Sequence, residues 1–110
     1  MQDLNSLIIE GELKENASIN ANMAGNYTVS FTVVSTRMSE EYFFPCYYYV
    51  SESLAKELET MLVSGAKLRI VGRLNQHRWT DKDGKKWSNI VVVAEHIEIR
   101  KKGGKDGKSN

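Results

Sequence analysis

The chain has 110 residues, of which 41% are hydrophobic and 26% charged, and these values are typical of a single soluble domain. No apolar run approaches the roughly 18 residues that a membrane-spanning helix needs, so a transmembrane protein is excluded. The net charge is +1, but residues 66–110 carry twelve Lys or Arg against five Asp or Glu, which indicates a surface for a polyanion unless these are simply solvated lysines.

The first half of the chain is predicted to form three strands, at residues 5–13, 27–34 and 42–50. The first alternates apolar and polar residues, and the other two are rich in β-branched and aromatic residues. Residues 14–26, with several Asn and a Gly, predict turns. A polar break at 37–41 precedes the third strand, in which Pro45 must interrupt the pairing on one side.

The second half is predicted to form one helix and a long hairpin. Ser51 is a suitable N-cap, and Gly65 is placed to end the helix. The predicted buried face of this helix consists of Leu54, Leu58, Met61 and Leu62. Alternation up to Trp79, turn residues at 81–84 and a strand at 87–99 then predict the hairpin.

The order of three strands, one helix and two strands predicts an all-β fold with one helix. It is the order of a five-stranded Greek-key barrel with the helix between strands three and four, the OB-fold. An α+β sandwich has the same order and stays open as an alternative. Residues 1–100 are assigned to this domain. Residues 101–110, rich in glycine and lysine, are expected to form a disordered basic tail.

The predicted hairpin tip has the composition of a nucleic-acid-binding surface. Residues 76–87 contain two Trp, one His and four Lys or Arg. Alternation places Asn75, His77 and Trp79 on one outward face. A base stacked on an aromatic ring contributes about 1–3 kcal/mol whatever its identity, and nearby cations attract phosphates. The alternative is that Trp79 and Trp87 form a cross-strand pair that stabilises the hairpin.

The third strand carries a second group of aromatic residues. Alternation divides this strand into an inward set and an outward set, with Phe44, Cys46, Tyr48 and Val50 on one face and Tyr47 and Tyr49 on the other. We expect Tyr47 and Tyr49 on the outside of the barrel, where their rings are available to bases. Because Tyr is enriched at protein interfaces, burial of both in a subunit contact is the alternative.

Other kinds of chemistry are not indicated. Cys46, His77 and His96 are too few and too scattered for a closed zinc site. Motifs of nucleophilic catalysis, phosphate-binding loops and paired carboxylates are absent from the sequence, so we expect no catalysis and no cofactor. The single cysteine cannot form an internal disulfide and residues 1–7 lack a secretory signal, which together predict a cytoplasmic protein.

The hairpin resembles that of bacterial single-stranded DNA-binding proteins. The resemblance is carried by Arg-Trp-Thr-Asp-Lys-Asp-Gly at 78–84 and Val-Val-Val at 91–93, and it extends through 61–74 to about residues 4–100. It implies an OB-fold that binds single-stranded DNA without sequence preference, cofactor or catalysis, in replication, recombination and repair at the nucleoid. It also implies a homo-oligomer, with a tetramer favoured over a dimer.

By position in the family pattern, Trp79 corresponds to the stacking tryptophan of the hairpin, Arg78 to the basic residue before it, and Trp87 to an aromatic residue of the returning strand. The predicted DNA-binding residues are these three with Lys82, Lys85 and Lys86, followed in second rank by Tyr47, Tyr49, Arg73, Asn75 and His77.

Three features depart from the family pattern. The family's tryptophan early in strand three aligns with Pro45 and its phenylalanine at the strand end aligns near Ser51, so Tyr47 and Tyr49 are the candidates to replace them. The break at 37–41 is shorter than the family's basic loop. The sequence ends among lysines and not in an acidic tip, so recruitment of replication proteins by such a tip is not expected.

Two alternative functions stay open. A tail-less primosomal, plasmid or phage accessory protein would keep the fold and the DNA-binding surface. An OB-fold that serves as a protein-interaction module would instead use the strand-three tyrosines and the hairpin to contact a partner. Weak, salt-independent binding of DNA would favour this second alternative.

Overall fold

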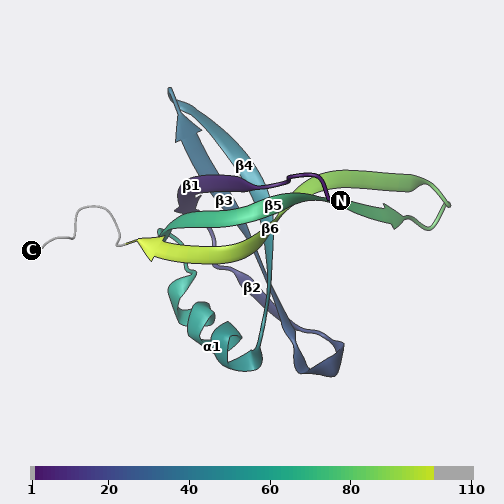
Figure 1. The fold of residues 1–110 in the computed structure, drawn as a ribbon, viewed down its shortest axis with the longest axis horizontal. Coiled ribbons are helices and arrows are strands. Elements are labelled where there is room, and N and C mark those ends of the chain that lie inside the picture. Colours follow the sequence, from purple (N-terminus) through teal and green to yellow (C-terminus); the bar gives the residue numbers. More distant parts are fainter. Residues whose placement is uncertain (1, 101–110) are drawn as a thin grey trace, which may run out of the picture.

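Runs of alternating buried and exposed residues form the strands of the computed structural model, which describes residues 2–100 (Figure 1). The elements are β1 (Leu7–Leu13), β2 (Ser18–Ala21), the 3-10 turn η1 (Met23–Gly25), β3 (Tyr27–Arg37), β4 (Glu40–Val50), α1 (Glu52–Met61), β5 (Lys67–Thr80) and β6 (Lys86–Arg100). The predicted tail at 101–110 lies outside the described residues.

Five of these strands close into a barrel. β1 pairs with β5, β5 with β6, β6 with β4, β4 with β3, and β3 with β1 again. The β4–β6 pairing is parallel, and the other four are antiparallel. This closed circuit, with α1 between β4 and β5, confirms the predicted OB-fold and excludes the sandwich. β3 and β4 are the predicted strands two and three.

The short strand β2 lies where turns were predicted. It pairs antiparallel with residues 27–30 of β3. The last pair of β1 with β3 is Leu13–Val33, so β1 and β2 pair with successive parts of β3. Within β2 only Ile19 packs against the core, so the segment shows no run of alternating apolar residues. The prediction of turns was therefore wrong for these four residues.

The predicted break at 37–41 is a two-residue hairpin turn. β3 and β4 stay paired as far as Arg37 and Glu40, and Met38 and Ser39 connect them with positive φ angles of 52° and 72°. Positive φ at both central residues matches the twist of the flanking strands. The neighbouring polar residues are solvent-exposed strand residues, which explains why the pattern indicated a loop.

The core lies inside the barrel, with α1 below it in Figure 1. Ser51 caps the helix as predicted, since its Oγ accepts a hydrogen bond of 3.4 Å from the backbone N–H of Leu54. Leu58 and Leu62 are buried, but Met61 is 41% exposed and does not belong to the buried face. The helix also ends at Met61, before the turn in which Gly65 adopts a φ of +92°. No helix within residues 2–100 is long and apolar enough to cross a membrane.

The β5–β6 hairpin projects from the barrel, toward the right in Figure 1. A β-bulge lies at its base, where Val71 pairs with His96 but Gly72 pairs with Ala94, and β6 stays in the barrel as far as Val92, which pairs with Cys46 of β4. A Cβ on Gly72 would lie 2.2 Å from the carbonyl oxygen of Val93, so this close approach requires glycine. Beyond the bulge, residues 73–80 and 86–90 are exposed, which makes both faces of the hairpin accessible.

Candidate nucleic-acid interface

Four rings form a row on the outer face of the barrel and hairpin, which we call the aromatic row: Tyr47, His77, Trp79 and Trp87. Trp79 and Trp87 are direct cross-strand partners, with ring centroids 6.5 Å apart and planes 15° apart. The His77 ring lies 5.3 Å from Trp79 and 6.3 Å from Tyr47. The row therefore runs from the wall of the barrel toward the hairpin tip.

The two tryptophans fit both interpretations drawn from the sequence, a cross-strand pair that stabilises the hairpin and a surface on which a base stacks. Their separation lies within the range of aromatic pairs that stabilise each other. Yet Trp79 is 43% and Trp87 44% exposed. Pairing across the strands thus leaves a large part of each ring accessible to a stacked base.

β4 has the two faces that alternation predicted. Cys46 and Val50 are buried, and Phe44 and Tyr48 pack against the core. Burial also raises the pKa of the Cys46 thiol to about 12 and keeps it protonated. Tyr47 and Tyr49 face outward, and Tyr49 is 56% exposed. Among residues 2–100, Tyr49 makes no ring contact with the aromatic row.

The basic residues of the hairpin surround the aromatic row instead of sharing one face with it. The ammonium of Lys85 lies 4.5 Å from the ring centroid of Trp87, a cation–π contact. Arg78 points to the opposite face, because neighbouring strand residues alternate, and its Nη2 donates to Oε1 of Gln76 at 2.6 Å. Lys86 pairs with Thr80 and shares that opposite face. The structure thus separates Arg78 and Lys86 from the rings.

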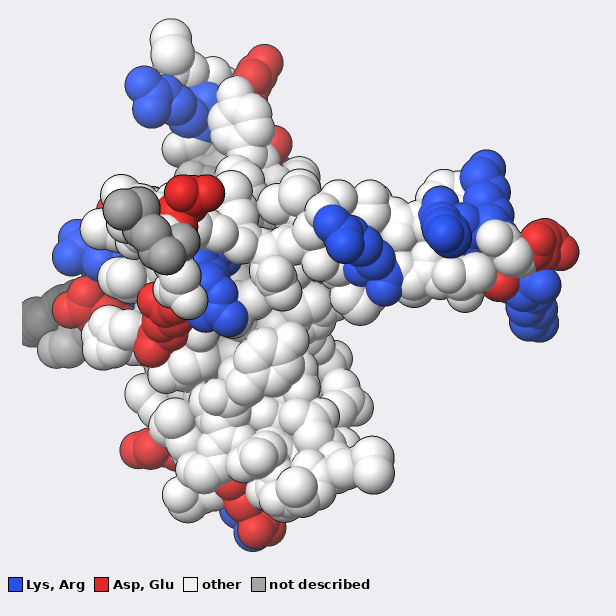
Figure 2. Space-filling view, turned by 45° about the vertical axis from the view of Figure 1, so that its right-hand side comes forward, with Lys and Arg blue, Asp and Glu red and all other residues white. Residues whose placement is uncertain are grey.

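Within residues 2–100, the hairpin cations have no carboxylate partner at ion-pair distance. None of the ion pairs within residues 2–100 involves the hairpin cations Arg78, Lys82, Lys85 and Lys86. Figure 2 shows Lys and Arg side chains along the projecting hairpin. Arg73 differs from them, since its Nη1 lies 2.8 Å from Oε2 of Glu95, the residue beside the bulge. Asn75 is exposed on the strand between these two regions.

A carboxylate organises the hairpin turn. Oδ1 of Asp81 accepts hydrogen bonds of 2.9 Å from the backbone N–H groups of Asp83 and Lys85. Oδ2 accepts one of 2.8 Å from the indole Nε1 of Trp87. The bond from Trp87, followed by that from the Lys85 N–H, lowers the pKa of Asp81. From the sequence, Asp81 was predicted only as a turn residue, and its contact with the ring of Trp87 was not predicted.

A hollow of about 380 Å³ borders the same outer face, beside the connection between β1 and β2. Its lining includes Lys14, Asn16, Thr32, Phe43, Pro45 and Tyr47. Phe43 is 60% exposed and was not among the predicted site residues. The alternation that selected Tyr47 and Tyr49 also selects Phe43, so the signal was present in the sequence.

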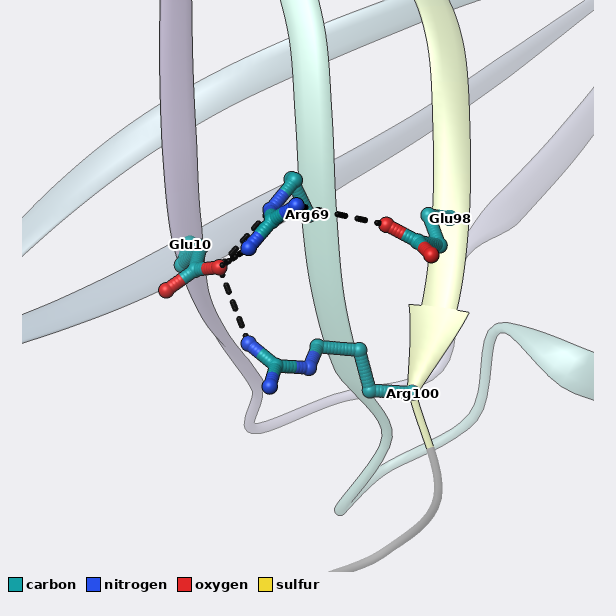
Figure 3. Close-up of polar contacts among 4 residues, drawn as sticks. All are labelled: Glu10, Arg69, Glu98 and Arg100. Carbon is teal, nitrogen blue, oxygen red and sulfur yellow. Dashed lines mark hydrogen bonds and ion pairs between the residues drawn. The ribbon is translucent and has the colours of Figure 1, made fainter.

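On the outside of the barrel, β1, β5 and β6 carry charges that neutralise one another, from Glu10, Arg69, Glu98 and Arg100, and we call this surface the ion-paired wall (Figure 3). Oε2 of Glu10 on β1 lies 2.6 Å from Nη2 of Arg69 and 2.9 Å from Nη1 of Arg100. Nη1 of Arg69 also lies 3.7 Å from Oε1 of Glu98. The hydrogen bond from Arg69 lowers the pKa of Glu10 and raises that of Arg69. Within the described residues, no group of three or more His, Cys, Asp or Glu could hold a metal ion.

Comparisons with known proteins identify the family of the chain. The family model described as "Single-strand binding protein family" matches residues 4–100. A curated relative, the "Single-stranded DNA-binding protein" of Aquifex aeolicus (strain VF5), is 29% identical over 105 residues, which cover 87% of this chain and 69% of the relative.

Proposed function

Given that the chain belongs to the single-strand binding protein family, we propose that it binds single-stranded DNA without sequence preference. The name of the Aquifex relative supports the same ligand. The observation that carries the proposal is the combination of an exposed aromatic row with four hairpin cations that lack carboxylate partners within residues 2–100. The protein acts by binding and not by catalysis.

Base stacking supplies the contact that is independent of sequence. Every base has a π face, so Trp79 and Trp87 accept any base at about 1–3 kcal/mol per stack. Tyr47 and His77 extend the row toward the barrel, and Phe43 beside the hollow extends the path across β4. An unpaired strand fits such a path because its bases are free to turn toward the rings.

Phosphate contacts supply the salt-dependent part of the affinity. Lys85 lies over Trp87, next to the position of a stacked base, and Lys82 lies in the exposed turn. Arg78 and Lys86 have long side chains on the opposite face of a two-stranded ribbon, from which they reach phosphates that pass the ribbon edge. Each phosphate neutralised releases counterions, so affinity falls as salt rises.

A homo-oligomer, with a tetramer favoured over a dimer, completes the proposal. β1 pairs with β5 along one edge but with β3 only through Glu12 and Leu13. Residues 7–11 therefore present an unpaired strand edge within the described part of the chain, and such an edge favours pairing with another chain. We place the assembly in the cytoplasm at the nucleoid, in replication, recombination and repair.

Titration with oligo-dT at several salt concentrations tests the function. Trp79 and Trp87 are the only tryptophans in the sequence, so intrinsic fluorescence reports directly on the proposed site. We expect strong quenching that weakens as salt rises. Absence of quenching together with absence of a shift in the anisotropy of labelled oligo-dT would refute the proposal.

A protein-interaction module is the second candidate function. Leu74 and Ile90, on the face of the hairpin opposite the aromatic row, are 46% and 55% exposed, which favours contact with an apolar partner surface. Binding of DNA that is weak and insensitive to salt would support this candidate.

A further inference from the structure

An acidic residue occupies the hairpin tip, where the proposed ligand is a polyanion. Asp81 stands among Lys82, Lys85 and Lys86, and its charge opposes the attraction that these cations exert on phosphates. Its carboxylate instead accepts three hydrogen bonds from within the hairpin. The carboxylate of Asp81 therefore has a structural role in the hairpin, which offsets its unfavourable effect on the attraction of phosphates.

The structural role of Asp81 is to orient the indole of Trp87. An exposed aromatic side chain rotates about two bonds, and binding of a base must fix both. The bond from Nε1 to Oδ2 of Asp81, at 2.8 Å, fixes the edge of the ring. The ring also lies beside Trp79, and the ammonium of Lys85 lies over it. The backbone N–H of Lys85 donates to the same carboxylate, so Asp81 holds both the indole and the backbone that carries the lysine.

We propose that Asp81 is a positioning residue for DNA binding, whose carboxylate holds the Trp87 indole and the Lys85 backbone in the arrangement that receives a base and its phosphate. The inference rests on the proposed function. A side chain that is ordered before binding loses less entropy when the ligand arrives, so affinity rises without a new contact.

The charge of Asp81 and its positioning role predict opposite effects of one substitution. Asp81→Asn removes a negative charge, which by itself strengthens attraction to DNA. It also replaces one carboxylate oxygen by an NH2 group, which cannot accept a hydrogen bond. Either the indole or the two backbone N–H groups then lose their acceptor. Asp83→Asn is the matched control, because the side chain of Asp83 makes none of the hydrogen bonds found in residues 2–100.

The experiment measures dissociation constants for labelled oligo-dT by anisotropy, with the full chain as wild type, Asp81→Asn and Asp83→Asn. We expect Asp81→Asn to bind about 3- to 10-fold more weakly, the effect of ordering one side chain, and Asp83→Asn to bind as tightly as wild type or more tightly. Asp81→Asn binding as tightly as Asp83→Asn would overturn the positioning role. Failure of wild type to bind would instead refute the proposed function itself.

A second variant separates positioning from a general loss of structure. Trp87→Phe keeps a ring but removes the indole N–H, so the bond to Asp81 is already absent. In this background we expect Asp81→Asn to weaken binding by a clearly smaller factor than in wild type. An equal factor in both backgrounds would show that Asp81 does not act through Trp87 and would overturn the proposal.

Discussion

The ion-paired wall and the hairpin tip both carry basic residues, but among the described residues these are paired with carboxylates only on the wall. On the wall, Arg69 contacts Glu10 and Glu98, and Arg100 contacts Glu10, so the two arginines are paired with two carboxylates. On the hairpin, Lys85 and its neighbours have no such partner in the described part of the chain. The number of basic residues in a segment therefore says less about polyanion binding than the pairing of each one.

The two regions also differ in what their exposed surface offers. Ion pairs exposed on the wall are screened by solvent, so they contribute little to stability and leave little net electrostatic field for a ligand. On the hairpin, aromatic rings lie next to cations that have no carboxylate partner within residues 2–100. They provide both a stacking surface and a positive electrostatic field. Residues 73–80 and 86–90 of the hairpin lie outside the core, so their exposure does not reduce burial in the core.

The largest expected effect on binding comes from removing one ring of the aromatic row. Trp79→Ala should weaken oligo-dT binding by the 1–3 kcal/mol of one stack, or about 5- to 150-fold. Because the ring is 43% exposed outside the core, the thermal unfolding midpoint should change little. Anisotropy titration and circular dichroism measure the two quantities, and unchanged affinity would remove Trp79 from the binding surface.

Substitution of cations in each region tests directly whether paired and unpaired cations contribute differently to the salt dependence of DNA binding. Lys85→Gln with Lys86→Gln should flatten the slope of log affinity against log salt by about 0.7 for each phosphate that the variant no longer neutralises. Arg69→Gln with Arg100→Gln removes as many charges from paired positions and should leave the slope nearly unchanged. Equal slopes for the two double variants would contradict the distinction between paired and unpaired cations.

Substitution of Phe43 tests whether the surface beside the hollow also binds DNA. Phe43→Ala should weaken oligo-dT binding by about 1 kcal/mol, the lower end of the range for one stack, since this ring lies outside the aromatic row. Tyr42→Ala is the control, because Tyr42 is the adjacent aromatic residue on the other face of β4 and is also partly exposed. Unchanged binding by Phe43→Ala would remove this ring from the binding surface, and equal weakening in both variants would show that the effect is not specific to the outer face of β4.

The smallest effect concerns acid stability of the wall. The pKa of Glu10 is lowered in the folded chain, chiefly by Arg69, so its contribution to stability is present above its unfolded value and is lost as pH falls through the lowered pKa. Between about pH 6 and pH 3, the thermal midpoint of Glu10→Gln should therefore fall less than that of wild type. A parallel fall in both proteins would show that Glu10 contributes nothing to the folded state.

Much of the fold could be predicted because its signals are local. The alternation in β1, β3 and β5, the Ser51 cap and the turn at 81–84 each depend on residues that are close in sequence. β2 was missed because a single apolar residue, Ile19, cannot establish a period. The break at 37–41 was predicted from its polar residues, but the positive φ angles of Met38 and Ser39 were not, because neither residue type favours a positive φ.

The candidate site could be predicted in composition but not in arrangement. Alternation selected the outward rings of β4 and the hairpin from sequence alone. Which cations are neutralised depends on contacts between distant residues, such as Arg69 with Glu10, that no local pattern indicates. The role of Asp81 depends on the position of the Trp87 ring across the turn. These features required the three-dimensional arrangement.

We propose that DNA follows the hairpin and the aromatic row and avoids the ion-paired wall. Amide and indole NMR spectra of the labelled chain, recorded as a short oligo-dT is added, test it residue by residue. We predict that both tryptophan indole signals and the amides of residues 76–87 shift, while those of Glu10, Arg69 and Glu98 do not. Shifts confined to the wall, with both indole signals unchanged, would contradict the account.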